Sequence, residues 1–321
     1  MAATEPRFQQ LTVARPFEVR RSELTCPGHS ARMMQKAAAS GADEVIFDLE
    51  DAVAVSMKAA ARASVIEALN TLSFGSTVRA YRVNGVRTAW CYRDVVDVLE
   101  AAGQNVDVLV VPKVEAPDEV QFIDHLLSGI EQAKGFAPGR IKLEALIESA
   151  RGLLAAREIA AASPRMASLI FGIADYAGDV GAKGFAEQPY AAFHYPRAHV
   201  VAAARAAGIA AIDAVTVQFK DLARVAQDAA DGAQLGFDGK WAIHPSHLAP
   251  IHAAYTPTRA EIDRARQVME AYAKADVQHG LGAIVLGDEM VDAASLRVEW
   301  KKLAVARKAG LVDEHFAWIG G

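Results

Sequence analysis

The segment DEVIFDLEDAV, residues 43–53, places acidic side chains directly after an apolar run. Its first half is typical of a buried strand, and Asp48, Glu50 and Asp51 follow within four positions. Carboxylates this close repel one another, and burying them is costly unless a cation or a polar substrate compensates their charge. The segment therefore predicts a metal ion or its water shell beside the strand end. A polar turn that leads into the next helix is the alternative.

Polar residues also end the other apolar runs that we interpret as strands. In chain order they are Arg82 and Asn84, Lys113 and Glu115, Glu148, Asp175, Asp213 and Gln218, and His244. Carboxylates from separate strands, such as Glu148 and Asp175, can converge on Mg2+, which prefers oxygen ligands and keeps several waters. Arg82 can hold a carboxylate or an enolate oxygen through its fork of N–H groups. Taken singly, Glu148 can instead begin a helix, Asp175 can cap one, and His244 can be a packing residue.

These side chains can meet only if their strands end at one edge of a sheet. Strand-like runs alternate with helical patterns, and the runs are 20–28, 43–51, 76–85, 106–115, 141–149, 167–177, 210–219 and 239–245. Eight such runs favour an α/β fold of the (β/α)8 TIM-barrel type, in which the carboxyl ends of all strands share one rim. An open doubly wound sheet needs a glycine-rich turn after its first strand, and CPGHS is not one.

We divide the chain into three parts. Residues 1–18 show no clear period and are predicted to be a loose lead-in, and residues 19–255 are predicted to be the TIM-barrel domain. Residues 256–321 contain two further helical patterns joined by the segment HGLGAIVLGDEM. They are predicted to be a C-terminal helical extension that packs on the barrel or on a neighbouring subunit.

The composition narrows the class of protein. Of 321 residues, 52% are hydrophobic, enough for a large core, and a formal net charge of −5 argues against a nucleic-acid or anionic-membrane partner. The two cysteines, Cys26 and Cys91, lack CxxC spacing and fit a reducing compartment. We find no signal-peptide pattern and no apolar run of the roughly 20 residues that span a bilayer. We therefore expect a soluble, cytoplasmic protein without a membrane partner.

Seven segments of the chain together resemble one enzyme superfamily. They are LTCPG, DEVIFDLEDAV, VRAYRVNG, VVPKVE, ALIESARG, FGIADYAGDVG and GKWAIHPSH. In this order they resemble the HpcH/HpaI aldolase and citrate lyase β-subunit superfamily, in particular its acyl-CoA lyase branch of malyl-CoA, β-methylmalyl-CoA and citramalyl-CoA lyases. The resemblance extends from about Arg20 to Gly310. It implies a barrel that uses Mg2+, with Mn2+ as a substitute, to cleave or form a C–C bond next to a coenzyme A thioester.

The resemblance also implies a class of substrate. A 3-hydroxyacyl-CoA would be converted to acetyl- or propionyl-CoA and a 2-oxo acid, glyoxylate or pyruvate, or formed from them. The segment between Asp175 and the seventh strand is shorter than in malyl-CoA lyases, which shifts the expectation toward citramalyl-CoA-type or other keto-acid substrates. Three alternatives stay open: a malyl-CoA thioesterase with the same metal site, a Schiff-base aldolase that uses Lys113, and a citrate lyase β-like (citryl-ACP lyase) subunit.

Matches to the superfamily's motifs imply roles for residues at the strand ends. Glu148 and Asp175 match the two protein ligands of the metal. Arg82 matches the arginine that binds substrate and stabilises the thioester enolate. Glu50 and Asp51 match acids that support the metal's water shell. Together these matches imply that the polar residues at the strand ends serve one metal-dependent reaction.

Other matches imply contacts with coenzyme A or substrate. The implied residues are Arg21, Thr25, Cys26, Pro27, Gly28, Lys36 and Pro245. Residues 25–28 match the segment that lies along coenzyme A, and Lys36 matches a basic residue near its phosphates. The branch commonly has an aromatic–glycine pair and a later arginine in this stretch, which this chain lacks.

Asp292, in EMVDAASLR, matches an aspartate of the C-terminal tail. The resemblance implies that it acts as general acid/base and reaches the site of an adjacent subunit. From the residues alone it reads as the N-cap of a helix. A site completed by a neighbour's tail favours a homo-oligomer, a trimer or a hexamer.

Overall fold

The computed structural model describes residues 19–183, 190–279 and 283–312, so the predicted lead-in, residues 1–18, lies outside the described residues. Two compact units are present. One is Arg20–Tyr255, and the other includes the residues from Thr256 onward.

The first unit is built on a closed parallel barrel whose strands follow chain order, with β8 pairing with β1. The strands are β1 (Ser22–Pro27), β2 (Glu44–Asp48), β3 (Val78–Arg82), β4 (Val108–Val111), β5 (Lys142–Ile147), β6 (Met166–Phe171), β7 (Ala210–Asp213) and β8 (Gly239–Ala242). The predicted (β/α)8 barrel is confirmed. Several strands end earlier than predicted, because the polar residues after them belong to loops or to the next helix.

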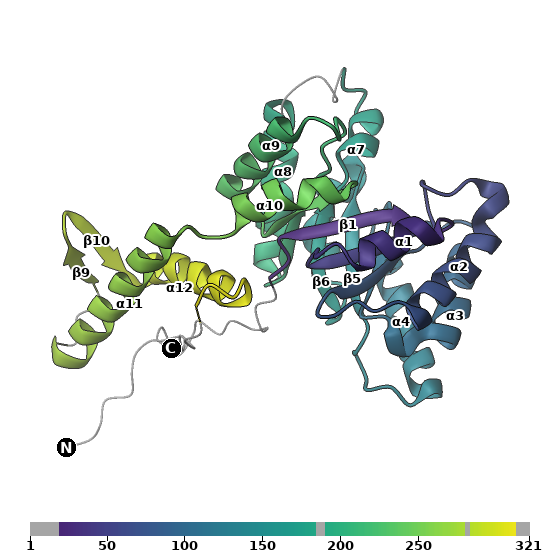
Figure 1. Cartoon of the computed structure of the whole chain (residues 1–321), viewed down its shortest axis with the longest axis horizontal. Coiled ribbons are helices and arrows are strands. Elements are labelled where there is room, and N and C mark those ends of the chain that lie inside the picture. Colours follow the sequence, from purple (N-terminus) through teal and green to yellow (C-terminus); the bar gives the residue numbers. More distant parts are fainter. Residues whose placement is uncertain (1–18, 184–189, 280–282, 313–321) are drawn as a thin grey trace. The chain divides into compact units, whose positions relative to one another are not determined.

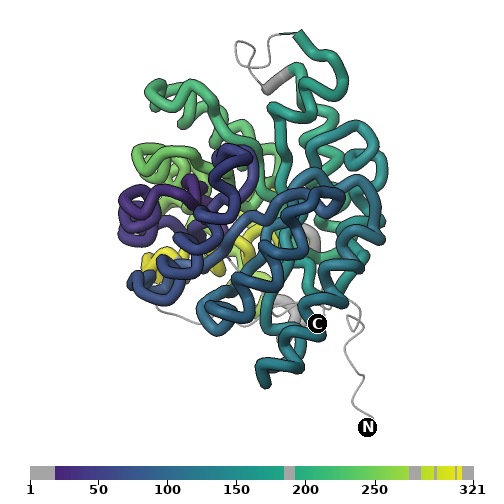
Figure 2. Tube along the Cα trace, turned by 90° about the vertical axis from the view of Figure 1, so that its right-hand side faces the viewer, coloured from purple at the N-terminus to yellow at the C-terminus, as the bar shows by residue number. Residues whose placement is uncertain are grey.

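Helices surround the barrel on its outside (Figures 1 and 2). They are α1 (Ala31–Ala38), α2 (Lys58–Thr71), α3 (Cys91–Ala102), α4 (Pro117–Lys134), α5 (Ala150–Leu154), α6 (Ala156–Ala160), α7 (Ile173–Asp179), α8 (His194–Ala206), α9 (Leu222–Leu235) and α10 (Leu248–Tyr255), with short 3-10 turns η1 (Val55–Met57), η2 (Gly103–Asn105), η3 (Tyr190–Phe193) and η4 (Pro245–His247). Local sequence sets their ends. Helix α4 begins at Pro117, where no N–H is needed, and ends at Lys134, followed by the capping residue Gly135 with φ of 70°. Within the described residues, no helix combines the length and apolar composition needed to cross a bilayer.

The barrel interior is layered along its axis. Its middle is apolar and contains Ile46, Ala80, Val108, Val110, Leu146, Ile170, Ile212 and Trp241. At the amino ends of the strands, Arg20 forms ion pairs with Glu144 and, at 3.2 Å, with Glu44. Glu23 joins them, and burial followed by the charge of Glu44 raises the pKa of Glu23 well above its usual value. A buried polar layer therefore closes the amino end, and ligands can be sought at the carboxyl end.

The second unit contains α11 (Arg259–His279), β9 (Ala283–Leu286), β10 (Glu289–Asp292) and α12 (Ala293–Lys308). Its own core includes Ile262, Val268 and Leu296. The predicted helical C-terminal region is confirmed, and the segment that joins its two helices forms an antiparallel hairpin. Gly287, with φ of 67°, provides the tight turn between its two strands.

Candidate active site at the carboxyl end of the barrel

The acidic turn after β2 is held from both sides. Asp48 accepts hydrogen bonds from the backbone N–H groups of Glu50 (2.8 Å) and Ala52 (2.9 Å). Lys58, at the start of α2, donates to the carbonyl oxygens of Leu49 (2.9 Å) and Glu50 (2.7 Å). Lys58 is buried and was missed by sequence reasoning, because a lysine at the start of a helical pattern gives no signal of such a contact. The turn is therefore fixed before any ligand binds.

Arg82, at the end of β3, forms a two-pronged ion pair with Asp48. Its Nε and Nη2 donate to the two carboxylate oxygens at 2.7 Å and 2.6 Å, and its Nη1 lies 2.9 Å from Glu50 Oε2. The guanidinium also lies 5.3 Å from the centre of the Trp241 ring. Burial acts to raise the pKa of Asp48, but the Arg82 charge and hydrogen bonds outweigh it and hold that pKa below the usual value. Because a guanidinium has five N–H groups, Arg82 keeps donors for a ligand.

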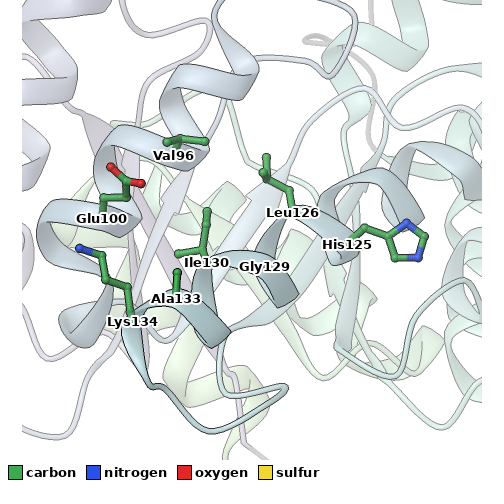
Figure 3. Close-up of a pocket in the computed structure, with 8 residues that line it drawn as sticks. All are labelled: Val96, Glu100, His125, Leu126, Gly129, Ile130, Ala133 and Lys134. Carbon is green, nitrogen blue, oxygen red and sulfur yellow. The ribbon is translucent and has the colours of Figure 1, made fainter.

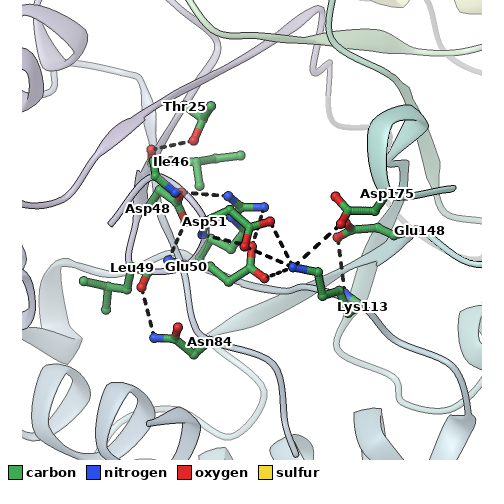
Figure 4. Close-up of polar contacts among 12 residues, drawn as sticks. Thr25, Ile46, Asp48, Leu49, Glu50, Asp51, Asn84, Lys113, Glu148 and Asp175 are labelled. Atoms are coloured by element: carbon green, nitrogen blue, oxygen red, sulfur yellow. Dashed lines mark hydrogen bonds and ion pairs between the residues drawn. The ribbon is translucent and has the colours of Figure 1, made fainter. Parts of the chain in front are cut away.

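Glu148 and Asp175 lie side by side (Figure 4). Glu148 follows β5 and is buried, whereas Asp175 is exposed in the first turn of α7 rather than at the end of a strand, which corrects its predicted position. Burial raises the pKa of Glu148 to about 8, an effect that Arg82 opposes and that the charge of Asp175 and its hydrogen bond to Glu148 increase. Two carboxyl groups thus lie next to each other at the rim.

Lys113 connects the two groups of acids. Its Nζ pairs with Glu50, lies 2.9 Å from Asp51 Oδ2 and lies 3.9 Å from Asp175 Oδ1. Its backbone N–H donates to Glu148 Oε1 at 3.2 Å. Glu50, Asp51, Glu148 and Asp175 are thereby gathered at one place, drawn in Figure 4.

These residues fit a hard divalent cation. All the donor atoms on offer are carboxylate oxygens, which Mg2+ prefers, and a site of one or two carboxylates leaves room for water and a chelating ligand. The raised pKa of Glu148 shows that its negative charge beside Asp175 is poorly compensated by the protein alone. Glu148 and Asp175 would hold such an ion, and Glu50 and Asp51 would accept hydrogen bonds from its waters.

Residues 25–28, the segment predicted to lie along coenzyme A, contact β2 and the acidic turn that follows it. Thr25 donates a weak hydrogen bond to the carbonyl of Ile46 at 3.4 Å. Cys26 is buried, and burial, followed by the charge of Asp48, raises the pKa of its thiol to about 12. Gly28 donates to the carbonyl of Asp48 at 2.8 Å, and a β-carbon there would lie 2.7 Å from that oxygen. Cys26 and Gly28 thus pack beside the acidic turn, and their predicted contact with coenzyme A stays a prediction.

Pro27, Lys36, Pro245 and Arg21 are placed differently. Pro27 ends β1, Lys36 is exposed in the last turn of α1, and Pro245 is exposed at the start of η4. Arg21 precedes β1 and pairs with Asp43 at 2.8 Å. Arg21 therefore lies at the amino end of the barrel, opposite Arg82, and the structure does not bring it to the site.

Other strand-end residues have structural roles. Asp213 pairs with Arg197 of α8 at 2.7 Å, so it faces the helical layer rather than the rim, contrary to prediction. Asn84 donates to the carbonyl of Leu49 at 3.0 Å and supports the acidic turn. His244 is exposed, and its Nδ1 lies 2.7 Å from the hydroxyl of Ser246.

Asp292 belongs to the second unit, where it ends β10. Its Oδ1 accepts a hydrogen bond from the backbone N–H of Ser295 at 3.0 Å and lies 3.2 Å from the Ser295 hydroxyl. This is the geometry of an N-cap for α12.

A small pocket of about 300 Å³ lies between α3 and α4 (Figure 3). Val96, Leu126 and Ile130 form its apolar wall, and Glu100 and Lys134 flank it. It is on the outer helices and contains none of the predicted site residues.

Comparison with known proteins gives consistent matches. A family model described as HpcH/HpaI aldolase/citrate lyase matches residues 21–245. The chain is 39% identical over 306 residues to the L-malyl-CoA/beta-methylmalyl-CoA lyase of Cereibacter sphaeroides, covering 91% of this chain and 95% of that protein. It is 34% identical over 301 residues to the citrate lyase subunit beta of Leuconostoc mesenteroides subsp. cremoris, and the match covers 94% of this chain and 98% of that protein.

A solved structure also matches. It is the CitE protein from Mycobacterium tuberculosis in complex with magnesium, acetoacetate and coenzyme A. The TM-score is 0.71 at 29% identity, and the match covers 90% of this chain and 98% of that chain.

Proposed function

The chain belongs to the HpcH/HpaI aldolase/citrate lyase family, and we propose that it is a Mg2+-dependent carbon–carbon lyase acting on a coenzyme A thioester. The substrate is a 3-hydroxyacyl-CoA with a carboxylate on its hydroxyl carbon, such as malyl-CoA, β-methylmalyl-CoA or citramalyl-CoA. The products are acetyl- or propionyl-CoA and glyoxylate or pyruvate. One observation carries the proposal: the carboxyl groups of Glu148 and Asp175 lie side by side at the rim where Arg82 also ends its strand.

Glu148 and Asp175 would hold the Mg2+, for which Mn2+ can substitute, and Glu50 and Asp51 would orient its waters. When bound, the ion supplies Lewis-acid stabilisation of negative charge on the substrate's hydroxyl and carboxylate oxygens. The fixed turn after β2 keeps Glu50 and Asp51 in place without reorganisation, because Lys58 and Asp48 hold its backbone.

Arg82 serves the thioester half of the substrate. As the C–C bond breaks, the hydroxyl group loses its proton and becomes the carbonyl group of the 2-oxo acid, and the electron pair of the broken bond passes to the thioester as an enolate. One proton is then returned at the enolate carbon, so no proton is gained or lost overall. Arg82 has N–H groups beyond those used by Asp48 and Glu50, and these can donate to the enolate oxygen. The Asp48 carboxylate fixes the guanidinium plane in advance, so its charge is already oriented when the enolate forms.

Asp292 would transfer the proton that completes the reaction. In cleavage it protonates the enolate carbon, and in synthesis it removes the α-proton of acetyl- or propionyl-CoA. We propose that it does so in a homo-oligomer, a trimer or hexamer, at the site of a neighbouring subunit. Coenzyme A would follow the end of β1, near Thr25 and Pro27, with Pro245 and Lys36 as further contacts.

A Schiff-base aldolase is a poorer fit. Such an enzyme needs a neutral amine as its nucleophile. Burial acts to lower the pKa of Lys113, but hydrogen bonds to Glu50 and Asp51 outweigh it and raise that pKa above the usual value. The amine of Lys113 therefore stays protonated.

The test is to incubate the purified protein with Mg2+, acetyl- or propionyl-CoA, and glyoxylate or pyruvate. We expect a condensed acyl-CoA, identified by mass, whose formation stops on addition of EDTA. Parallel assays of free thiol and of 2-oxo acid, started from the condensed product, separate the activities: release of free coenzyme A without 2-oxo acid identifies a thioesterase. Turnover only of an acyl-carrier-protein substrate would identify a citrate lyase β-like subunit instead.

A further inference from the structure

Lys113 has an unusual backbone conformation. It follows β4 and has a φ of 53°. Among the described residues, it is the only one other than glycine with a positive φ. A side chain in this left-handed region costs about 1 kcal/mol or more, and such strain persists where surrounding contacts impose it. Here the conformation directs the Lys113 N–H to Glu148 Oε1 at 3.2 Å. The strain is therefore linked to the position of a proposed metal ligand.

The Lys113 side chain reaches carboxylates from two other elements. Its Nζ pairs with Glu50 and with both oxygens of Asp51, at 3.1 Å and 2.9 Å, in the turn after β2. On the other side it lies 3.9 Å from Asp175 in α7. Figure 4 shows the ammonium group between these acids. One side chain thus spans the distance between the water-shell acids and the metal ligands.

The charge balance of the site explains why a lysine is needed. Arg82 is already engaged by Asp48 through two hydrogen bonds and by Glu50 at 2.9 Å. The carboxyl groups of Glu50, Asp51, Glu148 and Asp175 together still outnumber this one cation, and in their ionised form they would repel one another at short range. Lys113 provides the cationic group that three of these four acids face.

We infer that Lys113 is a positioning residue that holds Glu50 and Asp51 beside Glu148 and Asp175 and neutralises the same carboxylates that the divalent ion neutralises. The part of this inference that concerns the ion rests on the proposed function. The part that concerns the charge balance of the metal-free protein does not rest on the proposed function. The inference gives Lys113 no direct part in the chemistry, and its effect passes through the acids that it contacts.

Lys113 and the divalent ion therefore compete for the same carboxylates, and this competition can be measured without substrate. Lys113→Met removes the charge but keeps an unbranched side chain, and Lys113→Arg keeps the charge. In EDTA we expect the melting temperature of Lys113→Met to fall by several degrees and that of Lys113→Arg to fall less. We expect Mn2+, measured by electron paramagnetic resonance of the free ion, to bind Lys113→Met at least threefold more tightly than wild type, because the repulsion by the ammonium group is gone. Lys113→Arg should stay within threefold of wild type.

A third variant separates the backbone from the side chain. Lys113→Gly removes the charge and also relieves the left-handed strain, so it should bind Mn2+ like Lys113→Met but melt at a higher temperature. Lys142→Met is a matched control, because Lys142 begins β5 at the opposite end of the barrel and donates to the carbonyl of Gly139. It should leave Mn2+ affinity unchanged. The turnover of Lys113→Met at saturating Mn2+ should fall at least tenfold, since its acids are no longer held in place.

The outcomes are distinguishable. Equal or weaker Mn2+ binding by Lys113→Met, with wild type binding normally, overturns the inference and leaves the proposed function standing. Absence of Mn2+ binding by wild type overturns the proposed function, and the melting temperatures in EDTA then decide the role of Lys113. Equal stability of Lys113→Met and Lys113→Arg would reject that role.

Discussion

Gly172 lies directly against the side chain of Glu148. A β-carbon at position 172 would stand 2.5 Å from Cγ and 3.0 Å from Cδ of Glu148. The φ of Gly172 is −96°, which any residue can adopt, so the requirement for glycine here is one of space. Gly172 separates β6 from α7, and the absence of its side chain lets Glu148 reach the first turn that carries Asp175.

Gly172→Ala should displace the Glu148 carboxylate. We expect Mn2+ affinity to fall at least tenfold and the free energy of unfolding to fall by roughly 1–3 kcal/mol, as for other overpacked sites. Gly178→Ala, in the same helix, is the matched control, since no described atom lies within 4 Å of a β-carbon there. It should bind Mn2+ normally and be stabilised by about 0.5–1 kcal/mol. Normal Mn2+ binding by Gly172→Ala would contradict this account of Glu148.

Glu148→Gln and Asp175→Asn should each reduce turnover by at least a hundredfold and weaken Mn2+ binding, because each removes a charged oxygen ligand. Glu115→Gln controls for loss of a rim carboxylate. Glu115 lies two residues beyond Lys113 but faces Arg87 and Arg151, each at 3.8 Å. We expect it to retain wild-type turnover and Mn2+ affinity. Wild-type rates in Glu148→Gln at saturating Mg2+ would refute the ligand assignment.

The pKa of Glu148 makes the stability of the metal-free protein depend on pH. The folded group has a pKa of about 8 and its ordinary value is 4.5, so the folded state binds more protons between these limits. Stability therefore falls as the pH rises through this window. Glu148→Gln lacks this proton, so its free energy of unfolding relative to wild type should increase from pH 5 to pH 8, by roughly 1–3 kcal/mol. Urea denaturation in EDTA measures the difference, and parallel curves would contradict the prediction.

Metal binding should release the same proton. At pH 7 the Glu148 carboxyl is mostly protonated in the metal-free protein, whereas a ligand must be ionised. Calorimetry of Mn2+ binding in two buffers of different ionisation enthalpy should report release of close to one proton per ion at pH 6–7. The apparent affinity should rise up to about tenfold per pH unit below pH 8. No proton release would mean that Glu148 is already ionised.

Asp292→Asn should leave the fold and Mn2+ binding intact but block the proton transfer. Asparagine caps helices as well as aspartate does, so the hydrogen bond from the Ser295 N–H can be kept. Exchange of the acetyl-CoA α-proton with solvent deuterium, followed by mass spectrometry, should fall at least a hundredfold. Ser295→Ala removes only the hydroxyl partner and should exchange normally. Unchanged exchange in Asp292→Asn would remove this residue from the mechanism.

The buried polar layer at the amino end of the barrel should tolerate replacement of Glu23 but not replacement of Arg20. Glu23 is fully buried, and burial followed by the charge of Glu44 raises its pKa well above the usual value, so Glu23→Gln, which replaces the carboxyl by a neutral amide, should be nearly neutral for stability. Arg20→Met leaves Glu44 and Glu144 without their shared cation and should cost roughly 3–5 kcal/mol. Chemical denaturation compares the two variants. A large loss in Glu23→Gln would show that this glutamate is ionised.

Much of the site could be predicted because a TIM barrel turns position in the sequence into position in space. Residues that follow apolar runs, such as Arg82 and Glu148, must come to one rim once the strands are parallel and the barrel closes. The same argument failed for Asp213, since strand alternation sends every second side chain to the helical layer, and a short run does not fix its own register. Arg21 was expected near coenzyme A from the resemblance and not from this argument, and it precedes its strand.

By itself, the sequence determined the periodic elements, their order and the polar residues at their ends, because these depend on local spacing and on apolar patterning. Tertiary structure alone decided which of those residues meet. The pairing of Asp48 with Arg82, the contacts of Lys58 and Lys113, and the space that Gly172 leaves for Glu148 all join residues far apart in the chain. Such contacts arise from packing in three dimensions, and no local pattern encodes them.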